Sequence, residues 1–109
     1  MAKQFQKHFR KIHNAIFTGH PVYVFDEDGK DFLVLGITKS SETNGILNIP
    51  LSKNPEPHNK EQAYIRPKIM RVSKGVESYV QKGWHFANVD KKIVLSITDS
   101  IKKGSSAHR

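Results

Sequence analysis

One cation and a short run of hydroxyl groups in this sequence suit chemistry on a phosphodiester. Metal-free cleavage of RNA needs a group that positions or deprotonates the 2′-hydroxyl, an acid for the leaving oxygen and a cation for the transition state. Arg66, in the stretch AYIRPKIMRV, supplies a guanidinium whose fork matches phosphate geometry. Thr38 and Ser40, with Ser41 beside them, follow an apolar stretch. The candidate catalytic residues are therefore Arg66, Thr38 and Ser40.

A simpler interpretation of the same cations stays open. Arg66 and Arg71 on an exposed strand would discourage pairing with other chains without any chemistry. Convergence with the hydroxyl groups requires the second and fourth predicted strands to lie near each other. Polar and basic residues around these segments are the candidates for contact with nucleic acid: Lys39, Ser41, Lys53, His58, Lys68 and Arg71.

Other reaction classes find no support in the sequence. The chain has no cysteine, which excludes disulfides, thiolate zinc sites and a thiolate nucleophile. None of the six histidines stands in a metal-binding motif such as HExxH. Glycine-rich nucleotide-binding motifs and the GxSxG nucleophile motif are absent. The sequence therefore predicts neither a metal nor a cofactor.

The charge of the chain points to a polyanionic partner. Its 18 Lys and Arg face 10 Asp and Glu, a net charge of +8 with His neutral. The excess is uneven, because residues 21–50 carry two basic and five acidic residues while the rest of the chain is basic. Such a polarised field favours docking of a polyanion on one side. The predicted partner is RNA or single-stranded nucleic acid; basic charge that serves solubility alone is the alternative.

Four aromatic residues suit stacking on unpaired bases. They are Tyr23, Tyr64, Tyr79 and Trp84. Burial of such rings in a small sheet core is the alternative.

Nothing in the sequence predicts a membrane partner. No apolar run approaches the roughly 20 residues that a membrane span needs. The N-terminal stretch MAKQFQKHFRKIH lacks the apolar segment of a signal peptide. We therefore predict a cytoplasmic protein.

The hydrophobic pattern predicts one α+β domain over residues 1–104. An apolar stripe at helical spacing predicts an amphipathic helix over residues 3–17. The stripe consists of Phe5, Phe9, Ile12 and Ile16. This stripe is expected to pack either against the sheet or against a second subunit. Packing against a second subunit would give a homodimer. A second amphipathic helix is predicted over residues 88–103, with residues 105–109 as a flexible tail.

Between the two helices, apolar segments alternate with residues typical of turns, and this pattern predicts a twisted antiparallel sheet over residues 20–87. Strands are expected at residues 21–26, 31–38, 46–51 and 62–72. The loop at residues 52–61 holds two prolines and no apolar residue. Loops of this length in small domains are often functional.

A resemblance to a known family rests on a series of segments: His20-Pro21-Val22-Tyr23-Val24, FLVLGIT, the polar Ser/Thr-rich loop after it, AYIRPKIMRV, and Trp84-His85-Phe86 before the final helix VDKKIVLSITDSIKK. In this order they resemble the PemK/MazF-like toxin barrels and their ToxN-related members, over roughly residues 20–103. The resemblance implies an SH3-like barrel over residues 20–87 and a metal-independent endoribonuclease of a toxin–antitoxin or mobile-element system. It also implies an antitoxin partner, protein or RNA. Thr38 and Ser40 are the nearest equivalents of the family's hydroxyl group.

Two other functions stay open. A non-catalytic SH3-like module that binds nucleic acid or a protein partner needs only a basic face. An accessory protein of a phage or plasmid would act by blocking another protein.

Overall fold

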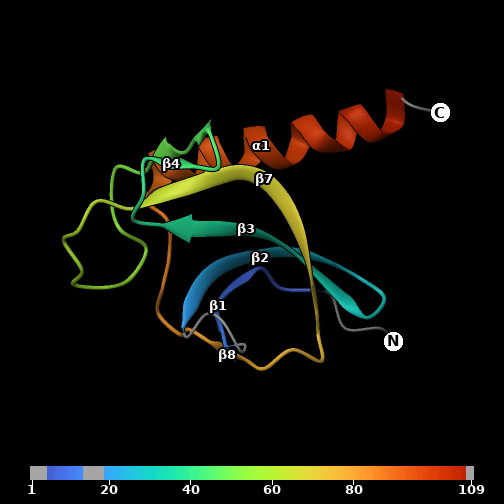
Figure 1. Ribbon diagram of the computed structural model, residues 1–109, viewed down its shortest axis with the longest axis horizontal. Helices are drawn as coiled ribbons and strands as arrows, with labels where there is room; N and C mark the ends of the chain where they lie inside the picture. Colours follow the sequence, from blue (N-terminus) through green and yellow to red (C-terminus); the bar gives the residue numbers. More distant parts are fainter. Residues whose placement is uncertain (1–4, 14–18, 108–109) are drawn as a thin grey trace.

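The computed structural model describes residues 5–13 and 19–107, with side chains through Asp99. An antiparallel sheet and a C-terminal helix make up this part of the chain, which confirms the predicted α+β class (Figure 1). The elements in chain order are β1 (His8–Ile12), β2 (His20–Asp28), β3 (Asp31–Thr38), β4 (Glu42–Thr43), β5 (Ile46–Leu47), β6 (Ile49–Pro50), β7 (Tyr64–Ser73), β8 (Ser78–Val80) and α1 (Asn88–Ala107).

Within the described residues, the main sheet has six strands in the order β6-β7-β3-β2-β1-β8. Strands β2 and β3 form a hairpin whose turn contains Gly29 at φ 61°, a left-handed conformation that glycine adopts without strain. Strands β4 and β5 form a separate small hairpin. The predicted strand at 31–38 coincides with β3, and the predicted C-terminal helix is confirmed as α1. Helix α1 extends through Ala107, so residues 105–107 are helical where a tail was predicted.

The sheet curves strongly but stays open (Figure 1). In the described residues β6 and β8 lie at opposite edges and do not pair, so the closed barrel expected over residues 20–87 is not observed. Strand β6 has two residues and includes Pro50, which has no N–H to donate. Strand β8 has three residues. Neither edge therefore offers a long ladder that would close the sheet.

The N-terminal segment is a strand where the sequence predicted a helix over residues 3–17. Strand β1 pairs with β2 on one side and β8 on the other, so the prediction is wrong for His8–Ile12. Phe9 and Ile12 are both buried, but they belong to different core clusters. A spacing of three places side chains on one face of a helix and on opposite faces of a strand. Ile16 and its neighbours 14–17 lie outside the described residues.

Among the side chains that the structure describes, apolar residues form two buried clusters, one on each face of the sheet. Leu35 and Ile37 belong to the cluster that α1 covers through Val94 and Ile97. The second cluster lies on the opposite face. Its buried members are Ile12, Val22, Val24 and Val34. Nowhere in the described ranges is a helix both long enough and apolar enough to cross a membrane.

A buried carboxylate ties the loop after β6 to the start of α1. Asp90 is 1% exposed. It accepts hydrogen bonds from the backbone N–H of Ser52 at 2.9 Å, the hydroxyl of Ser52 at 3.0 Å and the backbone N–H of Lys53 at 3.2 Å. Its position in the first turn also complements the helix dipole. Asp90 therefore fixes where the loop at residues 51–63 begins.

Candidate functional site

A pocket of about 280 Å³ opens where β3 ends and β2 begins. Antiparallel pairing of β2 with β3 brings these two strand ends together, since Val22 pairs with Gly36. Residues of the sheet, the loop at residues 51–63 and the segment before α1 form the pocket. The lining consists of His20, Pro21, Ile37, Thr38, Lys39, Ser40, Asn54, Glu56, Asn59, Ala63 and Trp84.

The predicted hydroxyl groups lie in this pocket. Thr38 Oγ1 accepts a hydrogen bond from the backbone N–H of Ser40 at 3.1 Å, a turn that fixes the first residues after β3. The carbonyl of Ser40 accepts from Asn48 Nδ2 at 3.0 Å, and the carbonyl of Ser41 accepts from the backbone N–H of Asn48 at 2.8 Å. The hydroxyl of Thr38 keeps its own hydrogen for donation. The backbone at Thr38 and Ser40 is therefore held in place, and the Thr38 hydroxyl can donate a hydrogen bond.

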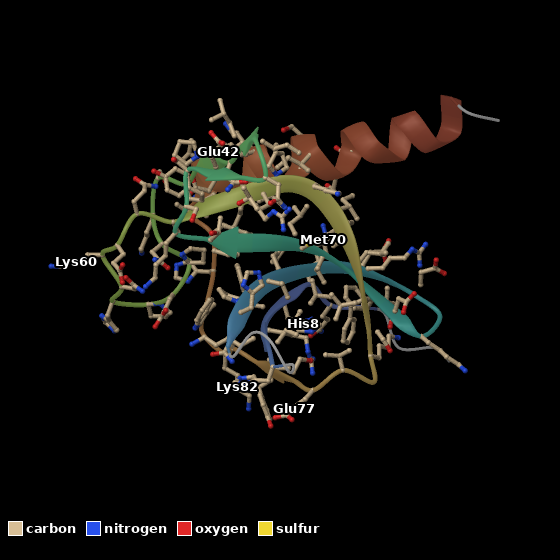
Figure 2. The ribbon with its side chains drawn as sticks, in the orientation of Figure 1. His8, Glu42, Lys60, Met70, Glu77 and Lys82 are labelled. Atoms are coloured by element: carbon tan, nitrogen blue, oxygen red, sulfur yellow. The ribbon has the colours of Figure 1, made fainter. Side chains whose placement is uncertain are left out.

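Arg66 does not line the pocket itself and lies on the sheet face opposite α1. The register of β3 and β7 shifts between Leu35 and Ile37, and the Arg66 side chain lies over Gly36. A Cβ atom at Gly36 would be only 3.2 Å from Arg66 Cδ, so the glycine makes room for the arginine. Arg66 Nη1 reaches Met70 Sδ at 3.7 Å, and Figure 2 labels Met70 between β7 and β3. Among the described side chains, no carboxylate pairs with Arg66.

His20 connects Arg66 to the pocket. It opens β2, lines the pocket and is half-buried. Burial lowers the pKa of its imidazole below the ordinary value of 6.5, and the nearby positive charge of Arg66 lowers it further. The lowered pKa favours the neutral imidazole of His20, and a neutral imidazole can accept a proton.

The loop at residues 51–63 forms the outer wall of the pocket through hydrogen bonds within itself. Asn54 Oδ1 accepts from the backbone N–H of Glu56 at 2.9 Å, and Asn54 Nδ2 donates to the carbonyl of Glu61 at 3.1 Å. Asn59 Nδ2 donates to Glu56 Oε1 at 3.2 Å, while Asn59 Oδ1 accepts from the backbone N–H of Glu61 at 2.9 Å. These bonds hold the loop in its conformation. Figure 2 shows Lys60 pointing from this loop away from the sheet.

Of the four aromatic residues considered for stacking, Trp84 lines this pocket. Its ring packs on Phe9 with centroids 5.7 Å apart, and Lys11 Nζ lies 5.5 Å from its centroid. Tyr23 packs on Phe9 in the core instead, and burial raises the pKa of its phenol. Tyr79 is 52% exposed at the edge strand β8.

The remaining predicted binding residues are spread over the surface. Lys39 lines the pocket, where its Nζ lies 3.4 Å from Glu61 Oε1. Lys53 and His58 line a second, open pocket formed by the loop at residues 51–63 itself. Arg71 pairs with Asp28 at 2.7 Å and Asp31 at 3.4 Å, near the β2–β3 turn. Two further candidates, Ser41 and Lys68, are exposed. The structure thus brings Thr38, Lys39 and Ser40 together and places Arg66 beside His20.

Sequence reasoning missed His20, Glu56 and Trp84 as parts of one site. The position of His20 could have been predicted, because it begins the strand that pairs in a hairpin with the strand ending at Thr38. Glu56 and Trp84 gave no such signal, because the fold of a long loop and a segment far along the chain brings them in.

No group of three or more His, Cys, Asp or Glu side chains in the described residues is arranged to hold a metal ion. Comparison of the chain with protein-family models, curated proteins and solved structures finds no match. The chemistry of the pocket is therefore the basis for any functional assignment.

Proposed function

We propose that the chain is a metal-independent endoribonuclease of the toxin type, with its active site in the pocket at the end of β3. The observation that carries the proposal is that His20, whose neutral form is favoured by burial and by the nearby charge of Arg66, lines the same pocket as Thr38 and Ser40. A proton acceptor, an acid for the leaving oxygen and a cation are the groups that cleavage at a ribose 2′-hydroxyl requires.

The roles follow from the chemistry of each group. His20 takes the proton from the 2′-hydroxyl, whose oxygen attacks the adjacent phosphorus. Arg66 stabilises the additional negative charge on the phosphoryl oxygens, and Thr38 and Ser40 donate hydrogen bonds to them. The bond from phosphorus to the 5′-oxygen breaks, and the ammonium group of Lys39 supplies the proton for this leaving oxygen. The products are a 2′,3′-cyclic phosphate and a 5′-hydroxyl end.

The wider assignment belongs to the same proposal. The curved sheet is an open variant of an SH3-like barrel, and the net charge of +8 draws the RNA strand to the protein. The protein acts in the cytoplasm, and an antitoxin, protein or RNA, restrains it by covering the pocket.

The test compares two substitutions on strand β7. Arg66→Met removes the guanidinium but keeps an unbranched side chain over Gly36, so the fold is expected to survive. Arg71→Met removes the same charge from the same strand near the β2–β3 turn, where Asp28 and Asp31 already neutralise it. Purified wild type is expected to cleave RNA with and without EDTA. Arg66→Met should lower turnover by at least about 100-fold, as expected for a group that stabilises the transition state.

Arg71→Met is the matched control and should lower cleavage by about threefold or less, since its charge is exposed and already paired. Equal losses in the two variants would show that general charge, rather than the position of Arg66, matters. Wild type that leaves RNA intact at high protein concentration would rule out the ribonuclease.

The second candidate is a non-catalytic module that binds nucleic acid or a partner protein. Exposed apolar side chains on the β4–β5 hairpin favour a protein partner, since Ile46 is 49% and Leu47 is 72% exposed. This candidate takes precedence if RNA binds to the protein and remains uncleaved.

A further inference from the structure

The proposed cleavage step leaves part of the pocket without a role. Trp84, Ile37 and Ala63 form an apolar wall, and Glu56 contributes a carboxylate from the loop at residues 51–63. An apolar wall with one or two fixed polar groups is typical of a site for a small planar ligand. The volume of about 280 Å³ lies just below the range of ligand pockets, about 300–1,000 Å³, and suits a single base.

Trp84 is suited to contact a base because its ring is fixed but not fully buried. Phe9 holds it from one side at a centroid distance of 5.7 Å. Lys11 Nζ lies over the ring, 5.5 Å from its centroid, and comes from the same face of β1 as Phe9, so its positive charge can also meet a phosphate next to a base on the ring. Unpaired bases bind proteins by stacking on such rings.

Glu56 determines which base fits. Its Oε1 accepts one hydrogen bond from Asn59, and its backbone N–H is bound by Asn54, so the residue is anchored from two sides. Each carboxylate oxygen can accept two hydrogen bonds, which leaves both oxygens able to accept from a ligand. In the described residues Glu56 has no cationic partner within ion-pair distance. Because an ionised carboxylate can only accept hydrogen bonds, Glu56 favours a base whose edge presents only hydrogen-bond donors.

Guanine is the base whose Watson–Crick edge carries two adjacent donors, N1–H and N2–H, which match the two oxygens of a carboxylate. Adenine and cytosine each place a ring acceptor next to their amino group, and that acceptor would face the carboxylate. Uracil flanks its single N–H with two carbonyls. We propose that this pocket holds one guanine of the RNA, with Glu56 as its specificity-determining residue and Trp84 as its stacking wall. This inference rests on the proposed function, because the bound base belongs to the strand whose phosphate meets Arg66.

Binding of short RNAs that cannot be cleaved tests the inference separately from catalysis. The probes are 2′-O-methyl trinucleotides with guanine, hypoxanthine, adenine, cytosine or uracil between two uracils. A methylated 2′-oxygen cannot attack phosphorus, so these probes stay intact. Trp84 is the one tryptophan of the chain, so the fluorescence of the full-length protein reports this pocket. Anisotropy of labelled probes gives the same affinities independently of that signal.

The guanine probe is expected to bind at least about tenfold more tightly than the adenine, cytosine and uracil probes, the usual discrimination of a bidentate contact. Hypoxanthine lacks the N2 amino group and should fall between them. Glu56→Gln should abolish the preference, while its amide oxygen can still accept from Asn59. Glu42→Gln removes one carboxylate charge from the β4–β5 hairpin and should retain the preference, because Glu42 does not line the pocket.

Equal affinity for the five probes would overturn the inference, and so would a guanine preference that survives in Glu56→Gln. Absence of binding at low salt would overturn it too. A guanine preference in a protein that leaves ordinary RNA intact would support the base pocket and reject the ribonuclease.

Discussion

The substitution Asp90→Ala tests how the structure holds the outer wall of the pocket. Asp90 is 1% exposed and accepts three hydrogen bonds, two from Ser52 and one from the backbone of Lys53. Each hydrogen bond to a charged group contributes about 1.5–3 kcal/mol to the free energy of unfolding. The alanine variant also avoids the cost of burying a carboxylate, so the net loss is smaller, about 2–4 kcal/mol.

Urea denaturation followed by circular dichroism measures this loss. Asp90→Asn keeps one acceptor oxygen and should lose about half as much. Asp99→Ala is the matched control, because Asp99 is exposed on the same helix and its removal should change stability by about 0.5 kcal/mol or less. In Asp90→Ala the loop at residues 51–63 loses its anchor, so affinity for RNA should fall as well. A free-energy change no larger than that of Asp99→Ala would refute this view of the loop.

Three further predictions concern the pH, the core and salt. The pKa of His20 is lower in the folded protein than its ordinary value of 6.5. The neutral imidazole therefore contributes to the free energy of unfolding above pH 6.5, and this contribution is lost as the pH falls through the pKa of the folded state. Cleavage should lose activity over the same acidic range, and His20→Asn should flatten the stability profile; an unchanged profile in that variant would contradict the assignment. Phe9→Ala should cost about 3–5 kcal/mol, because Phe9 is 4% exposed and packs on Tyr23, Trp84 and Phe86; an unchanged melting temperature would show that β1 is dispensable. Affinity for RNA should fall steeply with salt, because each phosphate contact releases condensed cations, and a flat salt series would exclude RNA as the main partner.

The parts of the fold with strong local patterns could be predicted from the sequence. Strand β3 combines a continuous apolar run with a turn before it, and its observed bounds match the prediction. Helix α1 begins at the predicted Asn88, because apolar residues recur there at helical spacing. The helix prediction for the N-terminal segment was wrong because it relied on the spacing of Phe9 and Ile12, which suits a helix. Pairing with β2 and β8 makes this segment a strand.

The candidate site was predictable in part for the same reason. Thr38 and Ser40 follow a well-defined strand, so their position at a strand end was evident. Glu56 reaches the pocket through a loop whose first residues are anchored by Asp90, far along the chain. Trp84 reaches it through contact with Phe9, in the strand that was expected to be a helix. Contacts between segments that are far apart in the chain produce no periodic pattern in the sequence, so they could not be predicted from it.

The products of RNA cleavage test the central proposal most directly. The substrate is an RNA oligonucleotide with several guanines, incubated with purified protein in EDTA and analysed by mass spectrometry. The proposal predicts fragments that end in a 2′,3′-cyclic phosphate and begin with a 5′-hydroxyl, and no cleavage next to a position that carries 2′-deoxyribose. Intact RNA, or cleavage that persists at the 2′-deoxyribose position, would contradict it.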